Sequence, residues 1–89
     1  MMPPSRAIVR EWLRDLAHGE VSRESAANAA RPWIGERERE VTDPSLWVPL
    51  TRLASADIES DPSEYLYDLW DFEAWLAEFE MATGPDEPS

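Results

Sequence analysis

No cysteine and no lysine occur among the 89 residues of this chain, and histidine occurs once, at His18. Without cysteine there is no disulfide framework, thiolate metal site or cysteine nucleophile. A single histidine supports neither a familiar zinc-ligand set nor a Ser/His/Asp triad. We therefore expect no metal, no cofactor and no enzymatic activity, and we interpret His18 as a cation that stabilises the end of a helix.

Long apolar runs are also missing from the sequence. None approaches the roughly 18 consecutive apolar residues that a membrane-spanning helix needs, and the first dozen residues lack the apolar segment of a signal peptide. No stretch alternates polar and apolar residues as a half-buried strand does. We therefore expect an all-α protein of the cytoplasm that does not bind membranes.

Positive charge is absent from the last 37 residues. Eight arginines and eight acidic residues lie at or before Arg52 and sum to zero, so the later eleven carboxylates carry the whole net charge of −11. Such a charge repels nucleic acid and attracts basic proteins. We therefore expect a basic protein partner and no direct nucleic-acid binding. The segment SRESAANAARPW could be mistaken for a helix-turn-helix, but the charge argues against it. The arginine row Arg6, Arg10 and Arg14 could contact phosphates; the alternative, which we favour, is a face that is solvated or paired within the chain.

Two amphipathic helices are predicted in the first part of the chain. Ser5 is a suitable cap for a helix that runs to about His18, and Ser22 caps a second one. Pro32 lacks an amide hydrogen, so the second helix should end near Arg31 or kink there. The chain is long enough for one small domain, and we expect residues 1–89 to form it, with disordered ends at 1–4 and 84–89.

Two further helices are predicted after a charged connection. Asp43 followed by a proline begins the third, which should run to about Ala56, and Asp68 begins the fourth, which should run to about Ala82. Asp61 and Glu64 have the spacing of a capping box, which would start a single turn. The prediction is a small four-helix bundle with an irregular acidic and aromatic segment, residues 57–67, between the third and fourth helices.

That irregular segment is the candidate binding site. Aromatic side chains surrounded by acids suit an energetic hot spot for a basic protein. The candidate partner-binding residues are Asp57, Glu59, Asp61, Glu64, Tyr65, Tyr67 and Asp68. The alternative is that both tyrosines make ordinary packing contacts. The acids begin like a calcium loop, but Pro62 stands where that loop needs a glycine, so we favour a charged, solvated segment.

These features resemble the colicin-type immunity proteins, small acidic four-helix proteins of bacteria that neutralise a cognate nuclease toxin. The resemblance rests on the first amphipathic helix, the turn and second helix at GEVSRESA, and the acid- and tyrosine-rich segment before a last helix bearing Trp75. It implies a partner-binding face made by Tyr65 and Tyr67 with Asp61, Glu64 and Asp68. In the nuclease-inhibiting branch the tyrosines are adjacent, whereas Leu66 separates them here, so at most one is expected to face outward in that way.

Two functions follow as hypotheses. The first is an inhibitor of the immunity type, which would block a basic toxin with its negative face and its tyrosines. The second is a different acidic interaction protein: a regulator, an adaptor or a mimic of nucleic acid that binds a basic, nucleic-acid-handling protein. The two differ in partner and share the same electrostatic attraction.

Overall fold

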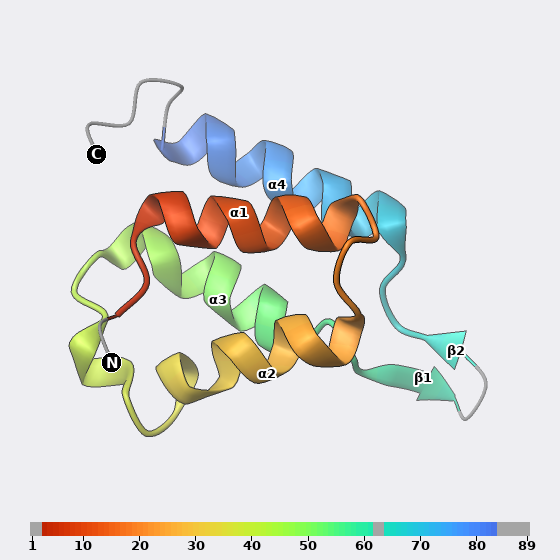
Figure 1. Ribbon diagram of the computed structural model, residues 1–89, viewed down its shortest axis with the longest axis horizontal. Helices are drawn as coiled ribbons and strands as arrows, with labels where there is room; N and C mark the ends of the chain where they lie inside the picture. Colours follow the sequence, from red (N-terminus) through yellow and green to blue (C-terminus); the bar gives the residue numbers. More distant parts are fainter. Residues whose placement is uncertain (1–2, 62–63, 84–89) are drawn as a thin grey trace.

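The computed structural model describes residues 3–61 and 64–83 and contains four α-helices, two short 3₁₀ helices and one small two-stranded sheet (Figure 1). The elements are α1 (Arg6–Ala17), α2 (Arg23–Ile34), η1 (Glu38–Glu40), η2 (Pro44–Leu46), α3 (Trp47–Ala54), β1 (Glu59–Asp61), β2 (Glu64–Tyr65) and α4 (Leu69–Thr83). The prediction of a mostly helical chain with four helices is confirmed. The prediction that no strand is present is wrong.

The four helices pack in two pairs. In Figure 1, α1 and α4 lie side by side and run in opposite directions, and α2 lies beside α3. The hairpin of β1 and β2 projects from the end of the molecule where α2 begins. One apolar core joins the two pairs; its largest fully buried side chains are Phe72, Leu13, Leu16, Leu50, Leu53 and Val9.

Both ends of α1 follow from local sequence. Ser5 precedes the helix, and its hydroxyl accepts a hydrogen bond from the amide of Ile8 at 3.2 Å, as an N-cap does. Beyond the helix, Gly19 has a positive φ of 72°, a conformation that costs glycine little. The amide of Gly19 donates to the carbonyl of Leu16, and the amide of Glu20 donates to the carbonyl of Asp15. This pair of bonds is a Schellman motif, which ends α1 and turns the chain toward α2.

Helix α2 continues past its proline. Ser22 caps the helix by accepting from the amide of Ser25 at 3.0 Å, as predicted. The helix ends at Ile34, three residues beyond Arg31, which corrects the expected end. Pro32 lies in the last turn, so only a short stretch of helix follows the missing amide hydrogen.

Helix α3 begins in two stages. Asp43 accepts from the amide of Ser45 at 3.0 Å and starts η2, which leads directly into the α-helix. Pro49 is the third residue of α3, where an amide has no partner within the helix, so the proline is accommodated. The predicted start at Asp43 is confirmed, and the helix ends at Ala54 rather than at Ala56.

The segment between α3 and α4 forms a hairpin in place of the expected irregular chain. Glu59 pairs with Tyr65 and Asp61 with Glu64, with a bulge between the two pairs. Part of the predicted capping box, at Pro62 and Ser63, lies outside the described residues. Two short strands with exposed side chains produce no regular alternation of polar and apolar residues, which is why the pattern did not reveal them.

Candidate functional site

The hairpin has one face against the helices and one face in solvent. Residues directly opposite each other in an antiparallel pair point to the same side, and neighbours along a strand point to opposite sides. Tyr65 lies toward α2, where its hydroxyl donates to Oε2 of Glu24 at 3.0 Å. Leu66 therefore points the other way, and so does Ile58, whose carbonyl accepts from the Leu66 amide at 2.8 Å. Both apolar side chains are exposed.

Both candidate tyrosines face the helices. The ring of Tyr67 packs edge-on against Trp75, with 4.9 Å between ring centroids, and its carbonyl accepts from Nη2 of Arg23 at 3.0 Å. The ring of Tyr65 lies 4.2 Å from the guanidinium carbon of Arg23. Tyr67 therefore packs against the core, whereas Tyr65 contacts Arg23 and Glu24 and still keeps 40% of its surface exposed.

The candidate acids differ in how far their charge is compensated. Asp57 accepts two hydrogen bonds from Nη2 of Arg31, at 2.7 and 2.6 Å, and so is neutralised within the molecule. Asp68 caps α4: its Oδ1 accepts from the amides of Trp70 and Asp71. Three further acids are exposed on the hairpin: Glu59, Asp61 and Glu64. Asp57 and Asp68 therefore stabilise the fold, and the three hairpin acids are accessible to solvent.

The charges around the hairpin change the pKa of Tyr65. The hydrogen bond to Glu24 and the negative charge of that carboxylate raise the pKa of the Tyr65 hydroxyl above 10.0, and partial desolvation and Glu59 act in the same direction. Arg23 opposes them. Tyr65 therefore stays a neutral donor under ordinary conditions and keeps its bond to α2.

Sequence reasoning missed an apolar stripe on the outer side of α4. Phe72, Trp75 and Phe79 fill the core side of this helix, but Trp70 is 81% exposed and Met81 is 85% exposed. The stripe consists of Trp70, Ala74, Ala77 and Met81, all exposed and spaced by four, three and four residues. Residues with this spacing share one helix face. The same spacing in the sequence would have revealed the stripe, but the inward aromatics alone were enough to explain the helix.

The arginine row of α1 is only partly available. Nε of Arg6 donates to Asp43 at 2.6 Å, and the guanidinium carbon of Arg10 lies 6.0 Å from the ring centroid of Phe79. Arg14 is exposed and has no side-chain partner within residues 3–61 and 64–83, and His18 is exposed one turn further on. Arg14 is therefore the member of the row that presents an uncompensated positive charge.

Most other arginines are paired. Nε of Arg37 donates to Glu40 at 2.6 Å while its guanidinium carbon lies 4.7 Å from the Trp33 ring, and Arg52 lies 3.3 Å from Glu78. Arg39, in η1, is exposed and, like Arg14, has no partner in the described part of the chain. The exposed arginines without a partner in the described residues, Arg14 and Arg39, therefore both lie in the first half of the sequence.

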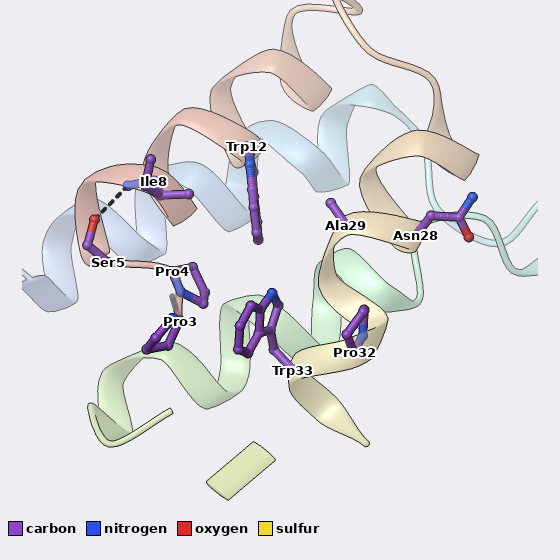
Figure 2. Close-up of a pocket in the computed structure, with 9 residues that line it drawn as sticks. All are labelled: Pro3, Pro4, Ser5, Ile8, Trp12, Asn28, Ala29, Pro32 and Trp33. Atoms are coloured by element: carbon purple, nitrogen blue, oxygen red, sulfur yellow. Dashed lines mark hydrogen bonds between the residues drawn. The ribbon is translucent and has the colours of Figure 1, made fainter. Parts of the chain in front are cut away.

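A cavity of about 580 Å³ lies between the start of α1 and the end of α2 (Figure 2). Figure 2 shows Trp12 and Trp33 pointing into it from the two helices, with Pro4 and Ile8 at its edge. Pro4 is buried, so this part of the N-terminal segment, which we expected to be disordered, packs against the helices. The lining is almost entirely apolar and carries no set of converging polar groups, which favours packing over catalysis.

Among the described residues there is no group of three or more histidine, cysteine, aspartate or glutamate side chains placed to hold a metal ion. In the same ranges, no helix has both the length and the apolar character needed to cross a membrane.

The fold and the charge distribution define a small helical protein with all of its arginines at or before Arg52 and its excess acid in the rest of the sequence. A family model described as YxzC DNA-binding protein matches residues 4–79, from the N-terminal segment into α4, and the chain belongs to that family. Comparison with curated proteins and with solved structures gives no match.

This membership corrects the functional expectations. The family is described as DNA-binding and is not an immunity family, so the resemblance to colicin-type immunity proteins and the toxin-inhibitor function are wrong. The same match contradicts the expectation that the protein does not bind nucleic acid directly. The net charge was a poor guide to nucleic-acid binding, because it describes the whole molecule, whereas the phosphates of a nucleic acid contact only one part of the surface.

Proposed function

We propose that this protein is a non-catalytic DNA-binding protein. The observation that carries the proposal is the family membership, which extends over α1, α2, α3 and most of α4. A second observation is compatible with it: all eight arginines lie at or before Arg52, in the part of the chain whose charges sum to zero. DNA would contact arginines of this part, although the acidic helix α4 packs beside α1.

The surface that we propose for DNA is the side of α1 that carries Arg14. This side chain is exposed and uncompensated, with Arg10 one turn before it and His18 one turn after it. Side chains four residues apart lie about 6 Å from one another along one helix face, which suits contacts to successive phosphates. Arg6 belongs to the same row but is held by Asp43.

We propose phosphate contacts and not base reading by a helix-turn-helix. The turn in that motif has about three or four residues. Here residues 35–46 separate α2 from α3 and include two 3₁₀ helices. The similarity of SRESAANAARPW to a helix-turn-helix is therefore confined to one helix. Binding by two or three cations against a net charge of −11 should be weak and strongly dependent on salt.

The test is fluorescence anisotropy of a labelled duplex titrated with the purified protein at low and at physiological ionic strength. The proposal expects saturable binding at low salt that weakens as salt rises, with Arg14→Gln binding less tightly than the wild type. Arg52→Gln is the matched control, because Arg52 already lies against Glu78 and should not contribute. No binding to duplex DNA under any salt condition would refute direct DNA binding.

A second candidate function is favoured by the eleven carboxylates that follow Arg52. We propose, as the alternative, an acidic regulator or adaptor that binds a basic DNA-handling protein through the hairpin acids Glu59, Asp61 and Glu64. Asp57 pairs with Arg31 before the hairpin, and Asp68 caps α4 after it. Tyr65 and Tyr67 anchor the segment to the helices. The two functions are separated by a competition experiment. If this protein occupies the DNA site of a basic partner, added DNA should displace it from that partner. If this protein binds DNA directly, added DNA should not displace it from the partner.

A further inference from the structure

The outer face of α4 has the pattern of a helix that pairs with another helix. Trp70, Ala74, Ala77 and Met81 follow the four, three, four spacing of alternating d and a positions in a heptad repeat. We call these four residues the α4 seam. They extend over about 16 Å of helix, and Figure 1 shows α4 at the edge of the molecule with α1 along its side.

The exposure of the seam is unusual for its composition. A helix that carries apolar residues on two opposite sides normally has both of them covered. Here the inner side meets the core through Phe72, Trp75 and Phe79, while Trp70 and Met81 at the two ends of the seam are more than four-fifths exposed. An exposed tryptophan is a common anchor of a binding surface. The seam is therefore an unpartnered apolar face.

The flanks of the seam specify the charge of its partner. In the same heptad assignment, Asp71 and Glu78 occupy the e positions, and Glu73 and Glu80 occupy the g positions. All four flanking residues are acidic. Glu78 has Arg52 at 3.3 Å and keeps 58% of its side-chain exposure, and Asp71 accepts from the amide of Asp68. Charges at e and g decide which helix pairs with which.

We propose that the α4 seam binds an amphipathic helix of another protein that carries arginine or lysine beside its apolar seam. A second copy of this chain does not fit, because pairing two α4 helices in either direction would set acidic flanks against acidic flanks. Each copy would also bring a net charge of −11. This inference goes beyond DNA binding and holds whether or not the α1 surface contacts DNA.

The test uses a synthetic helical peptide of about three heptads with leucine at a and d and arginine at e and g. A second peptide carries glutamate at e and g. The wild-type protein is expected to bind the arginine peptide and not the glutamate peptide, as measured by calorimetric titration in the absence of DNA.

The variant Trp70→Glu separates seam binding from general attraction to an acidic protein. It adds a negative charge, so general attraction would become stronger, whereas loss of the seam anchor should weaken binding about tenfold or more. Ile8→Glu is the matched control, because Ile8 is an exposed apolar residue that lines the cavity between α1 and α2 and gains the same charge. It should bind as well as the wild type.

Folding of both variants is checked by circular dichroism and urea unfolding. Ala77→Glu, at the centre of the seam, is a second variant that should lose the peptide in the same way. The proposal is overturned if neither peptide binds, if both bind equally, or if Trp70→Glu and Ala77→Glu bind like the wild type. Sedimentation that showed a wild-type dimer dissociated by Trp70→Glu would also overturn it, because a second copy would then cover the seam.

Discussion

Tyr65 donates its hydroxyl hydrogen to Oε2 of Glu24 across 3.0 Å, which ties strand β2 to the first turn of α2. The guanidinium of Arg23 is enclosed at the same place: its carbon lies 4.2 Å from the Tyr65 ring and 5.2 Å from the Phe72 ring. Nε of Arg23 is buried there without a hydrogen-bond partner among the described residues. The hairpin is thus part of the folded body, and Tyr65 is its anchor.

The anchor can be tested by titration of the tyrosines in the ultraviolet. Glu24 raises the pKa of Tyr65, first through the hydrogen bond and then through its charge. Glu24→Gln should lower the pKa of Tyr65 toward 10.0, and Tyr65→Phe should remove the late-ionising component from the titration. Glu20→Gln is the control, since Glu20 has no contact with the ring. An unchanged titration curve in Glu24→Gln would show that the hydroxyl does not bond this carboxylate in solution.

The loss of stability at low pH should depend on Asp43. The hydrogen bond from Arg6, together with the bonds from Ser45, lowers the pKa of Asp43 from 3.8 to about 2 despite partial burial. The folded state therefore keeps this carboxylate ionised when the unfolded chain is already protonated. Its stabilising contribution is complete above about pH 4 and is lost as the pH falls from 3.8 to about 2.

The ion pair of Arg6 and Asp43 is expected to contribute about 1 kcal/mol to the free energy of unfolding, because both side chains keep roughly a third of their exposure and solvent screens the pair. Asp43→Asn keeps an oxygen for the Ser45 amide and removes the charge. Urea unfolding at several pH values should show the variant less stable at pH 7, with a smaller fall in the free energy of unfolding between pH 4 and 2. Equal falls in wild type and variant would contradict the assignment to Asp43.

Two aromatic residues of α4 should differ widely in their effect on stability. Phe72 is 1% exposed, and its ring centroid lies 5.2 Å from that of Trp75. Phe72→Ala should therefore lower the free energy of unfolding by about 3 to 5 kcal/mol. Trp70, two residues earlier, is 81% exposed, and Trp70→Ala should change that free energy by no more than about 0.5 kcal/mol. Urea denaturation followed by circular dichroism measures both. A large cost for Trp70→Ala would mean that the seam is covered within the monomer.

The helices were predictable because their signals are local. Ser5, Ser22, Asp43 and Asp68 all cap helices as expected, since a side-chain oxygen near its own backbone needs no distant partner. The pairing of Glu59 with Tyr65 was not predictable, because short exposed strands carry no burial pattern and depend on contacts with α2.

The candidate binding residues stay a prediction, and the surroundings of the two tyrosines were not predictable from the sequence. The ring of Tyr65 lies against Arg23 while part of its surface stays exposed, and the ring of Tyr67 packs against Trp75. A sequence pattern of period two cannot tell which of two faces meets the body when both carry large side chains. The same limit applies to charge: the sum over the chain predicted no nucleic-acid binding, and the uncompensated Arg14 became apparent only when its neighbours were placed.

The most direct test of direct DNA binding is the salt dependence of duplex binding by the wild type and by Arg14→Gln. Each phosphate contact contributes about −0.9 to the slope of log K against log salt concentration. The account predicts a wild-type slope of about −2 to −3 and a slope smaller in magnitude by about 0.9 for Arg14→Gln, with the control Arg52→Gln unchanged. Identical slopes for the wild type and Arg14→Gln, or no measurable binding at low salt, would contradict it.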